Sequence, residues 1–230
     1  MTDIRRRTAV LAIGIAGLFL AACAQPASDG EPRRTGSAPI DAAAAEAGPL
    51  VAFLGDSISA GLGVAEDQAF PSVVGELLRE RRVPVRILNA GVSGDTTAGG
   101  LARLDRVLRQ RPDVIVVELG ANDALRGLPL DDTERNLRTL IERVRESGTS
   151  VLLLGMHIPT NYGRDYTTAF TQIYPRLADE LDVPVVLTFL EGVGGKRTMN
   201  LPDGLHPNPE GHRRLAANIL PSLSEIVTDL

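Results

Sequence analysis

The feature that most constrains the fold is an alternation of short apolar runs with amphipathic helical patterns. Five runs rich in Val, Ile and Leu recur along the chain: Leu50–Leu54, Val85–Leu88, Val114–Leu119, Val151–Leu154 and Val183–Leu187. Each run has the length of a strand and none alternates cleanly between apolar and polar residues, which is typical of strands buried on both faces of a parallel sheet. Strands that alternate with helices indicate a doubly wound α/β fold.

Apolar residues at helical spacing predict helices between and after these strands. Phe70, Val73, Val74, Leu77 and Leu78 follow the i, i+3, i+4, i+7, i+8 pattern of one helix face. The other patterns span Leu101–Leu108, Leu137–Val144, Phe170–Leu177 and Leu215–Leu223. Within them, Pro175 predicts an irregular or late start for its helix. We therefore expect a three-layer α/β/α sandwich around a five-stranded parallel sheet.

The N-terminal segment resembles a bacterial export signal. Arg5–Arg7 precede the apolar stretch Ala9–Leu20, which is too short to span a membrane comfortably but suits the central region of a signal peptide. The following Leu-Ala-Ala-Cys sequence resembles a lipoprotein signal, in which Cys23 becomes the lipidated first residue of the mature chain. The alternative is plain secretion, with cleavage near Cys23. Both interpretations export the protein.

The segment after Cys23 has the composition of a linker. Residues 24–48 are rich in Ala, Pro, Ser and Gly and lack any sustained apolar period, which is typical of disorder. We expect a signal peptide over residues 1–22, a lipid-anchored flexible linker over 23–49 and a folded domain over 50–230. Because Ala24 stands where an Asp favours retention in the inner membrane, we expect an outer-membrane anchor with the domain facing the periplasm.

Composition excludes several classes of partner. The net charge is -5, aromatic residues make up 3% of the chain and Trp is absent, so neither a basic patch nor stacking platforms for nucleic acid are available. The single cysteine cannot form an internal disulfide. We expect a monomer whose membrane contact is the N-terminal lipid anchor and which has no nucleic-acid partner.

Small and polar residues follow the predicted strands, where a doubly wound sheet binds its ligands. Gly55-Asp56-Ser57 follows the first strand, Gly94 lies in the loop after the second, Asn122 follows the third and His157 follows the fourth. A further loop, Asp203–His206, precedes the last helix. These loops are expected to meet at one edge of the sheet.

Ser57 is a candidate nucleophile only if a base can activate it, and the base itself needs an orienting group. The chain has three histidines: His157, His206 and His212. His206 follows Asp203 by three residues, so a turn can fold the carboxylate onto the imidazole. We rank His206 ahead of His157 as the base. We expect His212, inside the last helix, to pack or to face solvent.

Three groups can donate hydrogen bonds to an oxyanion: the backbone N–H groups of Ser57 and Gly94 and the side-chain amide of Asn122. The Ser57 N–H lies at a predicted helix N-terminus, where the helix dipole favours negative charge. Taken alone, Gly-Asp-Ser also suits a turn in which the serine merely caps a helix. A zinc site is poorly supported, because Cys23 is expected to be lipidated and the histidine spacing fits no common ligand pattern.

Four sequence blocks resemble the signature blocks of the GDSL/SGNH hydrolases in order and spacing. These blocks are Gly55-Asp56-Ser57, Gly94, Gly120-x-Asn122-Asp123 and Asp203-x-x-His206-Pro207. The stretches "NAGVSGDTTAGGLARLD" and "VELGANDALRG" resemble the branch of bacterial thioesterases, lysophospholipases and arylesterases. The resemblance covers nearly all of residues 51–230. It implies the flavodoxin-like, doubly wound SGNH hydrolase fold.

The resemblance also implies a serine esterase that needs no metal or organic cofactor. Ser57 would be the nucleophile, His206 the general base and Asp203 its orienting group, with Ser57, Gly94 and Asn122 as oxyanion donors. Acyl transfer to Ser57 would be followed by hydrolysis of the acyl-enzyme. The substrates would be small-molecule or lipid acyl esters, including thioesters and lysophospholipids.

Side chains near the strand ends are candidates for contact with the substrate, because ligand pockets are lined by apolar groups with a few polar ones. They are Asp56, Leu125, His157, Ile158 and Tyr162. Of these, Asp56 is expected to hold the loop rather than to react. Two other functions stay open from the sequence: a carbohydrate acetylesterase with the same triad, and a non-catalytic envelope lipoprotein that binds lipids or cell-wall fragments.

Overall fold

A computed structural model describes residues 48–230, apart from the side chain of Thr160. The predicted signal peptide over residues 1–22, Cys23 and all but the last two residues of the predicted linker lie outside the described residues. Regular structure begins at Leu50, and the carbonyl of the preceding Pro49 accepts a hydrogen bond from the N–H of Arg86 at 2.9 Å. Within residues 48–230, no helix has both the length and the apolar character needed to cross a membrane.

Five parallel strands form one sheet in the order β2-β1-β3-β4-β5. The strands are β1 (Leu50–Gly55), β2 (Arg86–Asn89), β3 (Val114–Glu118), β4 (Ser150–Leu154) and β5 (Val185–Val186). This order is the flavodoxin-like, doubly wound one, so the predicted fold is confirmed. Its crevice for ligands lies at the carboxyl ends of the strands.

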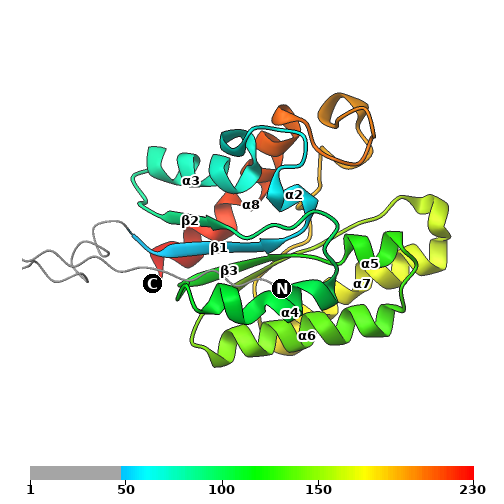
Figure 1. Ribbon diagram of the computed structural model, residues 1–230, viewed down its shortest axis with the longest axis horizontal. Coiled ribbons are helices and arrows are strands. Elements are labelled where there is room, and N and C mark those ends of the chain that lie inside the picture. The colour runs from blue at the N-terminus through cyan, green and yellow to red at the C-terminus, as the bar shows by residue number, and fades with distance from the viewer. Residues whose placement is uncertain (1–47) are drawn as a thin grey trace, which may run out of the picture. The chain divides into compact units, whose positions relative to one another are not determined.

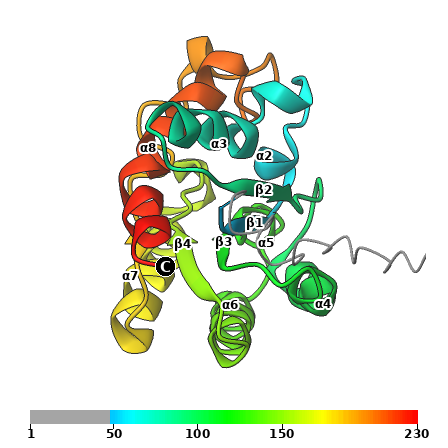
Figure 2. The ribbon, with the colours of Figure 1, turned by 90° about the vertical axis from the view of Figure 1, so that its left-hand side faces the viewer.

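Helices cover both faces of the sheet. They are α2 (Ser57–Ala60), α3 (Phe70–Glu80), α4 (Thr97–Leu108), α5 (Ala121–Leu125), α6 (Leu130–Glu146), α7 (Arg164–Leu181) and α8 (Pro209–Thr228). Three 3₁₀ turns are η1 (Glu66–Gln68), η2 (Thr160–Tyr162) and η3 (Arg197–Met199). Figure 1 shows α3 above the sheet and α4 and α6 below it. Figure 2 shows α8 beside α3 and α7 beside α6. The arrangement is an α/β/α sandwich.

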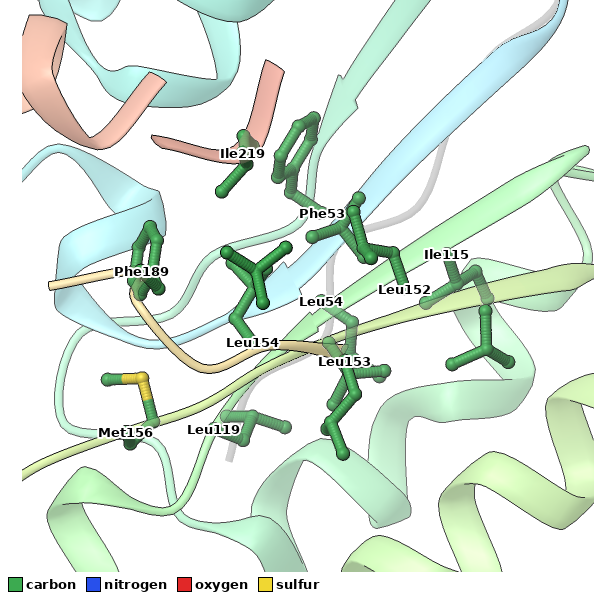
Figure 3. Packing of buried hydrophobic residues seen from close by; sticks show 14 of the residues in the cluster. Phe53, Leu54, Ile115, Leu119, Leu152, Leu153, Leu154, Met156, Phe189 and Ile219 are labelled. Atoms are coloured by element: carbon green, nitrogen blue, oxygen red, sulfur yellow. The ribbon is translucent and has the colours of Figure 1, made fainter. Parts of the chain in front are cut away.

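The core lies on both faces of the three central strands, β1, β3 and β4. Every residue of β3 is buried, and Val51–Gly55 of β1 are buried as well. Successive side chains of a strand point to opposite faces, so these runs serve both helix layers. Figure 3 shows Phe53 of β1 near Ile219 of α8, with Leu119 and Leu153 on the other side of the sheet. Full burial of each such side chain contributes about 1.5–3 kcal/mol.

The two edge strands differ from the expectation. β2 lies at one side of the sheet, pairs only with β1 and is not buried on both faces. Arg86 is exposed and the other three residues of β2 are half-buried. β5 is shorter than the predicted Val183–Leu187. Asp182 ends α7 in the left-handed conformation (φ 49°), and Pro184 has no N–H to donate to the sheet.

The prediction of a late or irregular start at Pro175 is wrong. α7 begins at Arg164 and continues through Pro175 to Leu181. A proline inside a helix removes one intrahelical hydrogen bond. The buried face, which includes Phe170, Ile173, Tyr174 and Leu177, packs on the core on both sides of this position and offsets that cost.

Candidate functional site

Ser57 lies at the junction between β1 and a very short helix. β1 ends at Gly55 and α2 begins at Ser57, with Asp56 as the N-cap: its Oδ1 accepts a hydrogen bond from the N–H of Ile58 at 2.9 Å. The interpretation of Ser57 as a mere helix cap is therefore wrong, since Asp56 makes the cap. α2 has only four residues, so its dipole is smaller than the sequence suggested.

A chain of hydrogen bonds joins Ser57, His206 and Asp203. Ser57 Oγ lies 2.9 Å from His206 Nε2, and His206 Nδ1 lies 2.7 Å from Asp203 Oδ2. The second oxygen of Asp203 accepts the N–H groups of Leu205 and His206 at 2.9 and 3.0 Å. The hydrogen bonds from the N–H and the imidazole of His206, and then the N–H of Leu205, lower the pKa of Asp203 to about 2. The carboxylate is therefore ionised at neutral pH.

Backbone hydrogen bonds hold the loop that carries His206. The carbonyl of His206 accepts from the N–H of Leu201 at 2.7 Å, and the N–H of Asn208 donates to the carbonyl of Met199 at 2.9 Å. The Asn208 side chain then accepts the first free N–H groups of α8. The imidazole is thus positioned by a closed loop fixed to a capped helix.

Asn122 lies beside the Ser57 turn, at the start of α5. Its Nδ2 donates to Asp56 Oδ2 at 2.9 Å. An amide has two N–H groups, so one remains free to bind a ligand. The preceding Gly120 has φ 116°, and a Cβ there would lie 2.3 Å from the hydroxyl of Tyr174, so this entry to α5 requires glycine.

Gly94 lies in the turn between β2 and α4 with φ 77°. Its carbonyl accepts from Arg126 Nη2 at 2.6 Å, and the N–H of the nearby Val92 donates to the carbonyl of Gly55 at 3.0 Å. These bonds hold the loop against the end of β1. Gly94 is not among the residues that line the cavity described below.

Arg103 of α4 is a connection that the sequence analysis missed. Its guanidinium donates to the carbonyl of Gly55 at 2.9 Å and to the carbonyl of Ala90 at 2.5 Å, and its Nε pairs with Asp95 at 2.6 Å. It therefore links the strand that carries Ser57 to the loop that carries Gly94. In the sequence it is one charged residue on an amphipathic helix, so nothing distinguished it.

A cavity of about 660 Å³ opens beside Ser57, Asn122 and His206. Four of the five predicted substrate-contact residues line it: Asp56, Leu125, His157 and Ile158. The fifth, Tyr162, is 40% exposed and lies outside the lining. The side chain of Asp56 is only 1% exposed, and its bonds to Ile58 and Asn122 occupy both oxygens.

The segment Leu187–Gly195 forms much of the remaining wall and was missed by the sequence analysis. It follows β5 directly, at the same edge of the sheet as the other loops. A usable signal was present, since the glycines Gly192, Gly194 and Gly195 gather after a predicted strand. The apolar side chains that it contributes to the wall are Leu187, Leu190 and Val193.

The other two histidines have different environments. His157 lines the cavity, and desolvation by its neighbours lowers its pKa. His212 is fully buried in α8; its Nδ1 accepts the N–H of Phe70 at 3.2 Å, and burial lowers its pKa to about 4. It packs in the core as a neutral ring. Within residues 48–230, His, Cys, Asp and Glu side chains form no group of three or more that would suit a metal ion.

Comparison with known proteins finds a matching family and relatives that cover most of the chain. Residues 53–214 match the sequence model described as the GDSL-like Lipase/Acylhydrolase family. Esterase TesA of Pseudomonas aeruginosa is 41% identical over 175 residues, covering 76% of this chain and 87% of that protein. The Escherichia coli K12 protein named thioesterase 1/protease 1/lysophospholipase L1 is 38% identical over 184 residues, covering 80% and 87%.

Among solved structures, the psychrotrophic esterase EstA from Pseudoalteromonas sp., inhibited by monoethylphosphonate, is 28% identical and superposes with a TM-score of 0.74. The match covers 78% of this chain and 99% of that chain. The family match includes Ser57, Asn122 and His206, which lie together beside the cavity.

Proposed function

Because the chain belongs to the GDSL-like lipase/acylhydrolase family and is an ester-hydrolysing enzyme, we propose that Ser57, His206 and Asp203 are its catalytic triad. The observation that carries the proposal is the hydrogen-bonded chain from Ser57 Oγ through His206 to Asp203 at the edge of the cavity. A serine needs this arrangement, because its hydroxyl is a weak nucleophile until a base takes the proton.

The reaction proceeds in two acyl-transfer steps. Ser57 Oγ attacks the ester carbonyl carbon while His206 Nε2 takes the hydroxyl proton. Asp203 stabilises the resulting imidazolium through Nδ1. The tetrahedral intermediate then expels the alcohol or thiol, which receives the proton from Nε2. Water, deprotonated by the same nitrogen, attacks the acyl-enzyme; the second tetrahedral intermediate expels Ser57 Oγ, which regains the proton from Nε2, and the acid is released.

The oxyanion is stabilised by the N–H groups of Ser57 and Gly94 and by Nδ2 of Asn122. Ser57 is the first residue of α2, so its N–H has no acceptor within the helix and is available to substrate. Asp56 supports the third donor, since its carboxylate fixes the orientation of the Asn122 amide. Donors that are held in place before the reaction stabilise the transition state without reorganisation.

The substrate is an ester with an apolar acyl chain. Apolar side chains dominate the wall away from Ser57: Leu125, Ile158, Leu187, Leu190, Val193 and Leu205. Exposed apolar residues also lie in the loops around the cavity, and two of them, Leu187 and Leu205, belong to its wall as well. Within residues 48–230, the exposed large hydrophobic side chains other than the terminal Leu230 lie in connections that leave the carboxyl ends of strands: Leu62, Val92, Leu128, Tyr162, Leu187 and Leu205.

A series of p-nitrophenyl esters from acetyl to long acyl chains tests this substrate class. Each buried methylene contributes about 0.8 kcal/mol, so kcat/KM is expected to rise about fourfold per carbon until the chain fills the cavity. Acyl thioesters and lysophospholipids extend the series, because the names of the relatives include these activities. Cleavage confined to the acetyl ester would contradict the proposal.

The enzyme is exported and anchored through a lipid on Cys23, facing the periplasm from the outer membrane. Support comes from the sequence around Cys23 and from the apolar substrate cavity. Radiolabelled palmitate is expected to enter the wild type but not Cys23→Ser, and only the wild type is expected to sediment with outer membranes. Equal labelling of the two proteins would exclude the anchor.

A further inference from the structure

A buried carboxyl lies directly beneath the turn that carries Ser57. Glu118 is the last residue of β3, pairs with Gly55 in the sheet register and is 0% exposed. Its Oε2 accepts three hydrogen bonds: from Ser59 Oγ at 2.7 Å, from the N–H of Asp56 at 3.1 Å and from the N–H of Ser59 at 3.2 Å. These donors lie on both sides of Ser57, so Glu118 fixes the path of the turn.

Gly55 provides the space that this carboxyl occupies. A Cβ on Gly55 would lie 2.6 Å from Glu118 Oε2 and 2.0 Å from Ser59 Oγ, which is closer than atoms can approach. The glycine, Glu118 and Ser59 therefore form one interlocked unit. Glu118 belongs to the structure of the turn even though it does not reach the cavity.

The two oxygens of Glu118 have different environments. Oε1 is buried and has no hydrogen-bond partner, and no Lys, Arg or His among residues 48–230 forms an ion pair with the carboxyl. An ionised carboxylate would share its charge over both oxygens, and a buried charged oxygen without a donor is very unfavourable. A proton on Oε1 removes that charge and leaves Oε2 as the acceptor for all three donors.

Asp56 is the neighbouring buried carboxyl, and both of its oxygens have partners. Ile58 donates to Oδ1 and Asn122 donates to Oδ2. Burial, and then the charge of Asp56, raise the pKa of Glu118 well above its usual range. Burial also raises the pKa of Asp56, but the hydrogen bond from Ile58 opposes this effect. Of the two groups, Asp56 is the better place for a single negative charge.

Other charged or titratable groups belong to the elements around this pair. They are Tyr174 of α7, Asp123 of α5, Arg103 of α4 and His206 of the loop before α8. The guanidinium of Arg103 is engaged by Asp95 and two carbonyls. Burial first, and then nearby carboxyls that include Glu118, raise the pKa of Tyr174, so its phenol stays neutral. A positive charge on His206 favours ionised Asp56.

We propose that Glu118 is a positioning residue that acts in its protonated form, leaving one negative charge, on Asp56, to align the amide of Asn122. A neutral Glu118 holds the turn without adding a second negative charge beneath the oxyanion, where such a charge would oppose catalysis. The catalytic consequence rests on the proposed function, whereas the protonation state can be measured without any substrate.

Thermal unfolding of wild type and Glu118→Gln between pH 4 and pH 8 tests the protonation state. In the unfolded chain Glu118 ionises near its ordinary value of 4.5. Above that pH, wild-type folding must take up a proton, so its unfolding constant rises about tenfold per pH unit relative to the glutamine variant. The Tm of Glu118→Gln minus that of wild type should therefore increase by about 3–5 °C per pH unit.

Glu134→Gln is the matched control, because Glu134 is an ionised glutamate. The hydrogen bond from Arg176 is the main reason that its pKa is lowered. Its stabilising effect is lost as the pH falls, so the Tm deficit of Glu134→Gln should shrink towards pH 4, a trend of opposite sign. If the Tm difference for Glu118→Gln is flat, or follows the trend of Glu134→Gln, Glu118 is ionised and the proposal is overturned.

Kinetics test the positioning role. Glu118→Ala, which removes the acceptor, should lower kcat about 100-fold with little change in KM, since a displaced turn misaligns Ser57. Glu118→Gln should recover most of that loss, because its amide oxygen can accept the same three hydrogen bonds. Equal losses in the two variants would overturn the positioning role. Failure of the triad itself would appear in the Ser57 variant and would leave the Tm pattern unchanged.

Discussion

Ser57→Ala is expected to lower kcat/KM for p-nitrophenyl esters by at least about 10³-fold, because the variant lacks the nucleophile that forms the acyl-enzyme in the proposed mechanism. Residual activity would come from the oxyanion donors and the cavity, which bind the substrate and position water without covalent catalysis. The Ser57 side chain is small and its backbone bonds are retained, so the melting temperature should change little. Initial rates over the full acyl series give the measurement.

Two controls separate loss of the nucleophile from general damage. Ser222→Ala replaces a half-buried serine on α8 and should retain wild-type rates. A fluorophosphonate probe, which reacts with activated serines, should label the wild type and Ser222→Ala at Ser57 but should not label Ser57→Ala. Hydrolysis by Ser57→Ala at more than about a tenth of the wild-type rate would rule out the proposed mechanism.

His206→Ala is expected to lower kcat to a similar extent, by about 10³-fold or more. In the proposed mechanism His206 takes the proton from Ser57 and later delivers it to the leaving group, so both acyl-transfer steps would lose their acid and base. Nucleophile and base work as one unit. The double variant Ser57→Ala/His206→Ala should therefore be no slower than either single variant within about threefold.

Comparison of the double variant with the two single variants shows whether Ser57 and His206 act together. If the two losses multiplied, Ser57 and His206 would act independently, and the hydrogen bond of 2.9 Å between them would have no catalytic meaning. Asp203→Asn tests the third member of the proposed triad. It keeps the shape of the loop but removes the carboxylate that would stabilise the imidazolium. It should reduce kcat, whereas the control variant Ser222→Ala should keep the wild-type value.

The sheet was predictable because buried parallel strands produce a strong local pattern. Apart from Glu118, the predicted runs that became β1, β3 and β4 are apolar throughout, and their strands are buried on both faces. The edge strands were less predictable. β2 and β5 each pair on one side only, so their limits depend on neighbours such as Pro184 rather than on their own composition.

The polar groups of the site were predictable for a topological reason. Parallel strands deliver their following loops to one edge, so Ser57, Asn122 and the Asp203–His206 loop had to approach one another. The hydrogen bonds of buried polar side chains were not predictable. Glu118 is one residue of an apolar run, and only the three-dimensional structure reveals that its carboxyl turns under the neighbouring strand to meet Ser59. A lone carboxyl inside a predicted buried strand was the available signal.

The walls of the cavity were the least predictable part. The segment Leu187–Gly195 has no regular period, and its contribution depends on how it leaves β5. Tyr162, by contrast, was chosen by its position after β4 and lies outside the lining. Position along the chain therefore identified the edge of the sheet correctly, but not the direction in which each side chain points.

The described residues begin and end at the amino ends of the parallel strands, whereas the cavity lies at their carboxyl ends. β1 starts at Leu50, and the terminal residues Asp229 and Leu230 line one surface pocket together with Ser150, the first residue of β4. Figure 1 shows the C-terminus at the same end of the sheet as the start of β1. A solid support or a fused reporter attached at either of these points would leave the entrance to the cavity unobstructed. The enzyme can thus be immobilised through its C-terminus in a defined orientation, so that substrates presented on vesicles reach Ser57 without crossing the matrix.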